Sequence, residues 1–443
     1  MTTEPVEFFV SLESGYLNVP FAGERPHESI LVDVPGTHYD PLGGQRALET
    51  MLETYLRVEK MGFDGTLHTE QHNGSLGMTP SSLMGAAWLA ARTDRIKIGV
   101  VGPIMNSYRS PVRLAEEIAI ADTLARGRLV VGLPFGLGST YHGLGMNPAT
   151  GRARQLEAQE LLAKALRDPG PFAWRGRFFN HEYVNVWPRP MHDVEFQLPG
   201  GGSKETLELA ARLRYAYQPH ANSLEELARS LEKFRDECRR QGYEPSPRQS
   251  VAVLNVHVAE TDAIAKAEIE DLTLWYMQNY VAARENDLFP PGYTSPQSIR
   301  AIRASGMFEG FPDLTYDGLV ESKTIISGSP ERVIEAIEEL IETTGVGRVV
   351  LTFSAGEKPR WMLEKTLGIF AEQVLPHFRK NGRPLSDEEP TYGYGTSLEY
   401  AANRRTDVLP VMAEKDGYLI DVERSRFDPE GARIRPVQYA GQD

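Results

Sequence analysis

Short apolar runs alternate with amphipathic stretches along most of the chain, and the alternation is clearest between residues 62 and 136. There the apolar runs TLH, IKIGVV and LVVG are separated by SSLMGAAWLAART and VRLAEEIAIADTLARG, where apolar residues recur every three or four positions. Such spacing indicates amphipathic helices, and short apolar runs bounded by Gly and Pro indicate buried strands. The order β-α-β-α-β therefore predicts parallel strands with helical crossovers.

The same rhythm continues as far as about residue 380. Further strands are expected at 7–13, 194–198 and 250–258, just before His220, and at 349–353; further helices are expected at 44–61, 153–166, 204–213, 223–241, 261–284, 333–343 and 361–378. Together these make roughly eight β/α units. The fold class predicted is α/β, a single (β/α)8 TIM barrel over residues 1–380, with insertions and a C-terminal extension.

Three segments interrupt this rhythm. Residues 172–189 alternate aromatic and polar side chains, which favours a small hairpin or an extended excursion. Residues 285–323 are rich in Pro, Gly and aromatic residues and too long for an ordinary connection, so we expect an irregular, lid-like insertion or disorder. Residues 381–443 have no helical period, and their tyrosines and apolar runs favour short strands or an arm.

The composition of the chain limits the classes of partner and the compartment that we expect. A formal charge of −14 argues against nucleic acid as a partner, because phosphate backbones require a concentrated basic surface. No window reaches the roughly 18 apolar residues that a membrane helix needs, and the first residues lack the basic and apolar regions of a secretory signal. The single cysteine, Cys238, fits a reducing compartment. We therefore expect a cytoplasmic protein with no nucleic-acid or membrane partner.

Polar residues follow several of the predicted strands. Ser203 comes directly after three glycines and opens a helix, with Thr206 one turn further on. Glycines allow close approach of a phosphate, and a helix N-terminus offers unpaired N–H groups; the same residues would also serve as a plain helix cap. His68 and His72 are four residues apart, but at a strand end they would not share a face, so no metal site is predicted.

An ordered set of motifs resembles the bacterial luciferase-like family of flavin-dependent monooxygenases. The set is Glu70-Gln71-His72, Arg92-Thr93, Ser110-Pro111-Val112-Arg113 with Ala115-Glu116, Asp122 to Arg128, GGGSKETLELAA at 200–211, SGSPE at 327–331 and the segment 349–379 that ends in QVLPHFR. The resemblance covers about the first 380 residues. It implies the barrel fold, and members of the family typically end near the QVLPHFR segment.

The resemblance implies a flavin site. It places the flavin phosphate at Gly202, Ser203 and Thr206. It also implies a cis peptide at Gly102-Pro103, in the backbone shelf under the flavin ring, and a polar contact to the ring from Asn106. The luciferases carry a phosphate-binding arginine after the fourth strand, where this chain has Phe135.

The resemblance also points to the residues that follow the second strand as catalytic. The luciferase motif is Glu-His-His, and its first histidine acts as a base; this chain has Glu70, then Gln71, then His72. A glutamine can orient a ligand by hydrogen bonds but does not titrate near neutral pH. An acid–base role would therefore fall to His72 or His68, and light emission in particular is in doubt.

The leading functional hypothesis is a two-component monooxygenase. Reduced FMN from a separate NAD(P)H-dependent flavin reductase would react with O2, form a flavin hydroperoxide in a water-excluded pocket and oxygenate a small organic substrate. One alternative is a deazaflavin-dependent oxidoreductase that transfers hydride on the same barrel. Another is a non-catalytic flavin-binding subunit, which Gln71 keeps open. The family also implies a homodimer.

Overall fold

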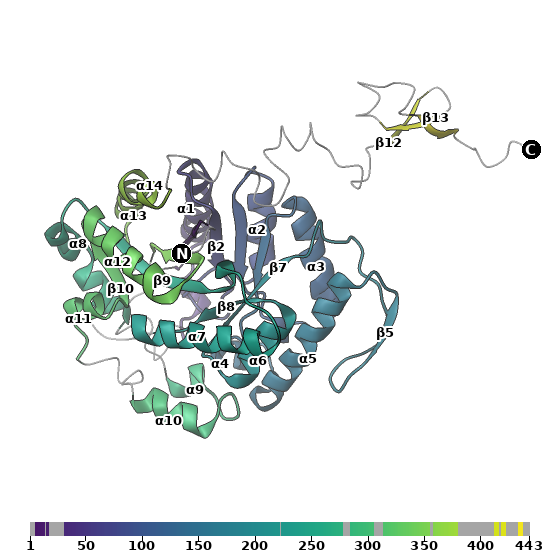
Figure 1. Ribbon diagram of the computed structural model, residues 1–443, viewed down its shortest axis with the longest axis horizontal. Helices are drawn as coiled ribbons and strands as arrows, with labels where there is room; N and C mark the ends of the chain where they lie inside the picture. Colours follow the sequence, from purple (N-terminus) through teal and green to yellow (C-terminus); the bar gives the residue numbers. More distant parts are fainter. Residues whose placement is uncertain are drawn as a thin grey trace, which may run out of the picture. The chain divides into compact units, whose positions relative to one another are not determined.

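The computed structural model describes residues 5–13, 15–16, 31–221, 223–277, 284–304, 313–354 and 358–379, and three short strands between residues 412 and 436. The chain divides into two compact units, Met1–Tyr392 and Gly393–Asp443. The first unit holds the main sheet and the candidate site. Its helices lie on the outer face of the sheet (Figure 1).

One sheet of nine parallel strands forms the first unit, in the order β10-β9-β11-β1-β2-β3-β4-β7-β8. The strands are β1 (Glu7–Ser11), β2 (Gly65–Thr69), β3 (Lys97–Val101), β4 (Leu129–Gly132), β7 (Glu195–Gly200), β8 (Ala216–Pro219), β9 (Val251–Val258), β10 (Ile325–Gly328) and β11 (Arg348–Thr352). A parallel bridge between Tyr217 and Ser250 brings β8 beside the start of β9, so the sheet is curled. The predicted α/β fold with a parallel sheet is confirmed.

The ninth strand, β10, is one more than the eight predicted units supply. The sheet can accommodate β10 because β9 is long enough to pair with two strands. Residues 251–255 of β9 pair with β11, and residues 255–258 pair with β10. β10 has only four residues and lies between the segment expected to be irregular and the helix expected at 333–343. Its apolar run is too short to be recognised from the sequence pattern.

The helices follow the sequence pattern closely. They are α1 (Pro41–Lys60), α2 (Ser82–Ala90), α3 (Pro111–Leu124), α4 (Gly138–Gly143), α5 (Pro148–Arg167), α6 (Lys204–Leu213), α7 (Leu224–Arg240), α8 (Asp262–Trp275), α9 (Glu285–Leu288), α10 (Pro296–Ala304), α11 (Tyr316–Glu321), α12 (Pro330–Thr344), α13 (Arg360–Ile369) and α14 (Leu375–Phe378), with short turns of 3-10 helix at Gly36–His38 (η1), Met105–Ser107 (η2) and Pro247–Gln249 (η3), and a π-helical turn at Phe370–Val374 (η6). Side-chain caps define many of the starts. Ser203, Ser223 and Thr261 each accept a hydrogen bond from the backbone N–H three residues on, which contributes about 1 kcal/mol per helix.

Two apolar layers result from the alternation of side chains along the strands. The inner layer, inside the curl of the sheet, consists of Phe9, Leu67, Val130, Ala216, Val251 and Val350. The outer layer packs the other faces of the strands against the helices, and on β1 it takes Phe8, Val10 and Leu12. Odd-numbered residues of β1 therefore point inward and even-numbered residues point outward.

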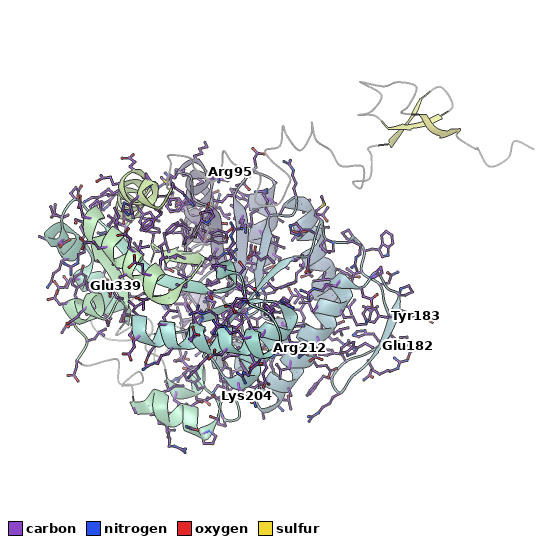
Figure 2. The ribbon with its side chains drawn as sticks, viewed as in Figure 1. Arg95, Glu182, Tyr183, Lys204, Arg212 and Glu339 are labelled. Carbon is purple, nitrogen blue, oxygen red and sulfur yellow. The ribbon has the colours of Figure 1, made fainter. Side chains whose placement is uncertain are left out.

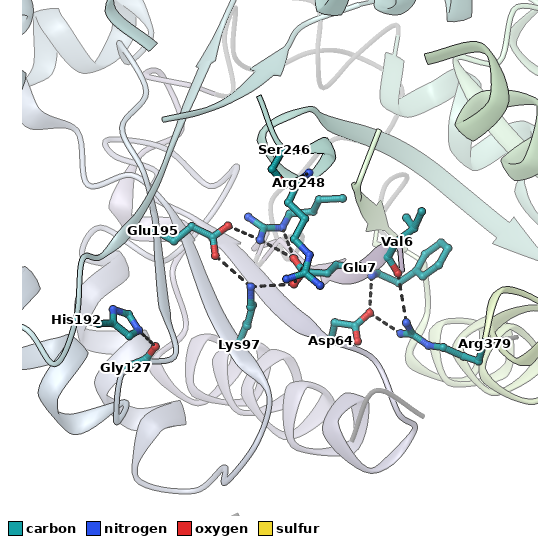
Figure 3. A network of polar contacts seen from close by, with 12 residues as sticks. Val6, Glu7, Asp64, Lys97, Gly127, His192, Glu195, Ser246, Arg248 and Arg379 are labelled. Atoms are coloured by element: carbon teal, nitrogen blue, oxygen red, sulfur yellow. Dashed lines mark hydrogen bonds and ion pairs between the residues drawn. The ribbon is translucent and has the colours of Figure 1, made fainter. Parts of the chain in front are cut away.

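A buried network of charges closes the amino end of the curled sheet (Figure 3). Glu7, Lys97, Glu195 and Arg348 are the first residues of four strands. The Arg348 guanidinium donates to Glu7 Oε2 at 2.6 and 2.9 Å and also pairs with Glu195. Lys97 Nζ lies 2.9 Å from Glu7 Oε1 and 3.1 Å from Glu195 Oε2. Because this end is filled by paired charges, a ligand has to approach from the carboxyl end of the strands.

The three irregular segments have mixed outcomes. The hairpin prediction is confirmed by antiparallel strands β5 (Phe172–Arg175) and β6 (Asn180–Val184). The expectation that 285–323 is irregular is wrong for much of what the structure describes there, because α9, α10 and α11 all form within it; residues 305–312 lie outside the described residues. In the second unit, β12 (Met412–Lys415), β13 (Tyr418–Asp421) and β14 (Arg433–Pro436) form an antiparallel sheet, and the rest of 381–443 lies outside the described residues. The lid and extension roles stay predictions.

Candidate functional site

Most of the predicted site residues follow the carboxyl ends of β2, β3 and β7. Glu70, Gln71 and His72 come directly after β2, Gly102 and Pro103 come directly after β3, and Ser203 lies between β7 and α6. Because the strands are parallel, these ends share one rim of the sheet, where ligands bind in barrel-like α/β proteins.

Glu70 joins three chain segments through its carboxylate. Oε1 accepts from the Ile104 N–H at 3.0 Å and lies 3.1 Å from His72 Nε2. Oε2 accepts from the N–H of Ser82 at 3.3 Å and from its hydroxyl at 3.1 Å. This buried carboxylate therefore fixes the end of β2 to the loop after β3 and to the start of α2, which is a positioning role.

His68 is fully buried and faces α2. Its Nε2 lies 2.6 Å from the Ser82 carbonyl oxygen, to which it donates, and Gly85 leaves room for the ring, since a Cβ there would lie 2.8 Å from Nε2. Burial lowers the pKa of His68 below its ordinary value. A neutral imidazole with no exposed surface does not touch a ligand in this conformation, so a direct role for His68 stays a prediction.

Gln71 and His72 keep accessible surface at the rim. The His72 side chain is 13% exposed and is oriented by Glu70. The Gln71 side chain is half-buried and lies against Gly77, where a Cβ would come within 2.8 Å of Gln71 Cγ. Of the four predicted catalytic residues, these two are placed to meet a ligand, and their catalytic roles stay predictions.

The loop after β3 has the predicted backbone. The Gly102–Pro103 bond is cis, and the preceding Val101–Gly102 bond is cis as well. A Cβ on Gly102 would lie 2.6 Å from the Ile104 backbone nitrogen and 3.1 Å from Glu70 Cβ. Only glycine fits this close approach of the β2 and β3 ends.

Asn106, in η2, is committed to protein partners. Its Nδ2 donates to the Tyr141 hydroxyl at 2.7 Å and to the Gly151 carbonyl at 3.0 Å, and its Oδ1 accepts from Arg154 at 3.3 Å. Burial raises the pKa of Tyr141 to about 12, so its hydroxyl stays protonated. Asn106 thus fixes the loop after β3 to α4 and α5, and the predicted contact with a flavin ring stays a prediction.

The start of α6 gathers several hydrogen-bond donors. The Ser203 Oγ lies 2.9 Å from Thr206 Oγ1 and accepts from the Thr206 N–H at 3.3 Å. Gly202 has a φ of +74°, which a side chain would strain. Hydrogen bonds from its own N–H and from the Ser203 hydroxyl lower the pKa of the exposed Glu205 carboxyl. A carboxylate therefore already sits on the donors that a phosphate would use.

Arg152, from the first turns of α5, adds a cation that the sequence reasoning missed. Its Nη1 donates to Ser203 Oγ at 3.3 Å, and its guanidinium lies 5.0 Å from the centre of the Phe135 ring. Phe135 is the residue that stands where the resemblance expects an arginine. A cation from α5 lies there instead, and Phe135 is the surface on which it stacks. Lys204, at the same helix start, is exposed and labelled in Figure 2.

The described residues hold neither a candidate metal site nor a candidate membrane-spanning helix. No group of three or more His, Cys, Asp or Glu side chains there could hold a metal ion. No helix in that part of the chain is long and apolar enough to cross a membrane.

The curled sheet of parallel strands, covered by helices, defines the class as a barrel-like α/β protein, and the candidate site lies at the carboxyl ends of its strands. Residues 30–348 match the luciferase-like monooxygenase family, and the chain belongs to that family. The resemblance predicted from the ordered motifs is confirmed.

Individual relatives are distant but aligned over most of their length. In sequence the chain is similar to 4-hydroxyprotoasukamycin monooxygenase from Streptomyces nodosus subsp. asukaensis, with 24% identity over 376 residues, 82% of this chain and 95% of that protein. In structure it is similar to the oxygenating constituent of 3,6-diketocamphane monooxygenase from Pseudomonas putida in complex with FMN, with TM-score 0.62, 18% identity and coverage of 84% and 98%.

The structural likeness extends to a protein with a different cofactor. The coenzyme F420-dependent tetrahydromethanopterin reductase from Methanopyrus kandleri matches with TM-score 0.57 and 19% identity, covering 85% of this chain and 99% of that one. At such identities the likeness establishes the shared fold. It leaves both flavin and deazaflavin in the comparison.

Proposed function

We propose that this protein is the oxygenating component of a two-component flavin-dependent monooxygenase. It would bind reduced FMN delivered by a separate NAD(P)H-dependent flavin reductase, and use O2 to oxygenate a small organic substrate. Reduced flavin, when bound, supplies the two electrons that activate O2. The single observation that carries the proposal is the cluster of Arg152, Ser203 and Thr206 at the start of α6, in a chain of the luciferase-like monooxygenase family.

The donor set fits a flavin phosphate. Arg152 supplies a guanidinium, Ser203 and Thr206 supply hydroxyls, and the first turn of α6 supplies N–H groups that have no partner within the helix. The helix dipole adds partial positive charge at the same place. The exposed Glu205 carboxylate would have to turn away, which costs little because it is not packed against other groups.

Water exclusion would come from the segment between α9 and α10. The Tyr293 hydroxyl donates to the Gly136 carbonyl oxygen, and the Tyr293 ring packs edge-on against Phe135 with centroids 5.0 Å apart. His142 Nε2 lies 3.2 Å from the Asn286 carbonyl oxygen. Contacts from α9 (Asn286) with α4, and from the segment after α9 (Tyr293) with the loop that carries Phe135, support a lid over that side of the rim, next to Arg152.

We further propose a cytoplasmic homodimer. Met84 on α2 and Ile120 and Leu124 on α3 are large apolar residues that lie exposed on neighbouring helices. Contiguous apolar surface on paired helices is a common basis for self-association. Cys238 is a buried free thiol, which suits a reducing compartment.

The alternative cofactor is a deazaflavin of the F420 type, and the structural match to an F420-dependent reductase supports this alternative. That reading predicts hydride transfer without O2. The third reading, a flavin-binding subunit without activity, predicts that bound reduced FMN is reoxidised as it is in free solution.

The test compares ligands and variants in anaerobic binding titrations. We expect reduced FMN to bind, and Arg152→Met to weaken it about 10- to 100-fold, because a hydrogen bond to a charged group contributes about 1.5–3 kcal/mol. Riboflavin, which lacks the phosphate, should bind wild type and Arg152→Met equally. Lys204→Met is the matched control and should change FMN binding less than about twofold, because Lys204 is 75% exposed.

Three results would decide against the proposal. Tighter binding of F420 than of FMN would favour the deazaflavin reading. Equal effects of the Arg152 and Lys204 variants would remove the phosphate site. Reoxidation of bound reduced FMN at the free-solution rate, without a spectrum distinct from those of the oxidised and reduced forms, would favour the inactive subunit.

A further inference from the structure

Glu13 is a carboxyl at the carboxyl end of β1, on the rim that carries the candidate site. In the register of β1 with β2, Ser11 lies opposite Leu67. Continued for two residues, this register places Glu13 level with Thr69, immediately before Glu70. On the other side its N–H donates to Ser354 Oγ at 2.9 Å, just after β11. Glu13 therefore stands between the ends of β11 and β2.

The side chain of Glu13 faces the inside of the curled sheet. Along β1, Glu7 belongs to the buried charge network and Phe9 to the inner layer, whereas Phe8, Val10 and Leu12 belong to the outer layer. Since side chains alternate with period two, Glu13 continues the inward series. Within this series of residues, Glu13 is the carboxyl nearest the open end, as Glu7 is the one nearest the closed end.

Hydroxyl groups lie close to Glu13. The Tyr276 hydroxyl, just after α8, lies 3.4 Å from Glu13 Oε2. The Tyr55 hydroxyl, from α1, is close enough for the Glu13 charge to help raise its pKa, after burial as the main cause. Tyr276 also lines a small cavity with Lys358, whose ammonium donates to the Val256 carbonyl at 3.0 Å. Within the described part of the chain, no cation forms an ion pair with Glu13.

This environment raises the pKa of the Glu13 carboxyl toward neutral pH. Burial raises the pKa of Glu13 to about 7, and the hydrogen bond from Tyr276 opposes the rise. The side chain is half-buried rather than sealed, so it lies among protein atoms yet keeps accessible surface. A carboxyl of this kind can hold a proton at neutral pH and release it when a neighbouring group demands it.

We propose that the Glu13 carboxyl is the proton-transferring group of the candidate site, in the role that Gln71 lacks the chemistry to fill. The inference rests on the proposed flavin-dependent function. His68 is buried and His72 is bound to Glu70. Glu13, in contrast, keeps accessible surface and forms no ion pair with any cation among the described residues. It follows β1, and Gln71 follows the neighbouring strand β2.

The proton balance of the reaction suits such a group. Without substrate, O2 takes two electrons and two protons from the reduced flavin and leaves as hydrogen peroxide. With substrate, one oxygen atom enters the product and the other leaves as water with the same two protons. No net proton is consumed, so Glu13 holds one proton for part of the reaction and ends in its starting form.

The first test needs no cofactor. Carbon-13 NMR of glutamate carboxyls in the full-length apo protein should show one group with a midpoint near pH 7 that is absent in Glu13→Gln. Tyr276→Phe should move this midpoint upward, because the lost hydroxyl stabilised the charged form. The raised folded pKa also means that wild type loses stability relative to Glu13→Gln as pH rises from about 4.5 through about 7.

The second test uses reduced FMN and O2. Glu13→Gln should bind reduced FMN within about twofold of wild type in anaerobic titration. Its reaction with O2, followed by flavin absorbance in a stopped-flow instrument, should slow about 100-fold and lose the pH dependence near 7. Tyr276→Phe should keep the reaction and shift its midpoint upward with the NMR midpoint. His72→Gln, the control, should keep the midpoint of wild type.

Each contrary result has a separate meaning. If Glu13→Gln keeps the rate and pH profile of wild type, or if the midpoint disappears in His72→Gln instead, the inference is overturned while the proposed function stands. If no carboxyl titrates near pH 7 in the apo protein, the inference is overturned on its own. If wild type fails to bind reduced FMN, the proposed function fails first and the inference fails with it.

Discussion

Single residues determine how closely the strand ends can approach each other at the rim, and Gly102 is an example. The β2 and β3 ends approach so closely there that a Cβ would lie 2.6 Å from the Ile104 backbone nitrogen. The same Ile104 N–H donates to Glu70. The sequence identified Gly102 and Glu70 as site residues, but it could not reveal that they act on each other. Nor could it show that His68 is sealed or that Asn106 is fully bonded, because those facts depend on side chains brought together from distant segments.

Replacing this glycine should therefore destabilise the protein. We expect Gly102→Ala to lower the free energy of unfolding by about 1–3 kcal/mol, since the extra methyl forces backbone atoms apart. Gly201→Ala is the control: a Cβ there meets no atom within 4 Å, so its effect should stay within about 0.5 kcal/mol. Urea denaturation of the apo variants measures both. Equal stabilities would mean that the β2 and β3 ends can separate without cost.

Most helices and strands could be predicted from the sequence, because their apolar residues recur with a regular period. The helix starts at Ser203 and Ser223 follow from cap residues placed just before apolar-periodic stretches. Most of the failures were short elements: β10 has four residues, and the segment expected to be irregular holds α9 with four, α11 with six and α10 with nine. Such elements take their conformation from their neighbours. Arg152 was missed for a related reason, because only packing of α5 against the loop of Phe135 brings its guanidinium to Ser203.

The segment between α9 and α10 should behave as a separately held element. Tyr293→Phe removes the hydrogen bond to the Gly136 carbonyl and should cost about 1 kcal/mol. Because only local contacts are lost, we expect faster amide hydrogen exchange in residues 284–304 with little change in the global melting temperature. Tyr183→Phe, on the exposed face of the hairpin (Figure 2), is the control. An unchanged exchange rate in Tyr293→Phe would show that the apolar contacts alone hold the segment.

At the scale of the whole molecule, the two ends of the curled sheet are built for different tasks. Both ends carry an inward-facing carboxyl on β1. At the amino end Glu7 pairs with three cations, whereas at the carboxyl end Glu13 pairs with none in the part of the chain that the structure describes. Burial would raise the pKa of Glu7, but Arg348, Lys97 and Arg248 outweigh it and lower the pKa to about 2. A carboxyl held charged in this way stabilises the fold, whereas one held near neutrality is available for chemistry.

The closed end should therefore govern acid stability. A folded pKa near 2 against an ordinary value of 4.5 means that the contribution of Glu7 is present above pH 4.5 and is lost as pH falls toward 2. Glu7→Gln leaves Arg348 and Lys97 undercompensated, and we expect it to cost about 3–5 kcal/mol at pH 7. The difference from wild type should shrink as pH falls from about 4.5 toward 2, because the unfolded chain then binds a proton at Glu7 that the folded protein does not. Glu364→Gln, which breaks partly exposed pairs with Arg57 and Arg360, should cost less than about 1 kcal/mol at any pH. Denaturation curves at several pH values decide the matter: a cost for Glu7→Gln that stays constant down to pH 3 would show that packing, and not charge, closes the amino end.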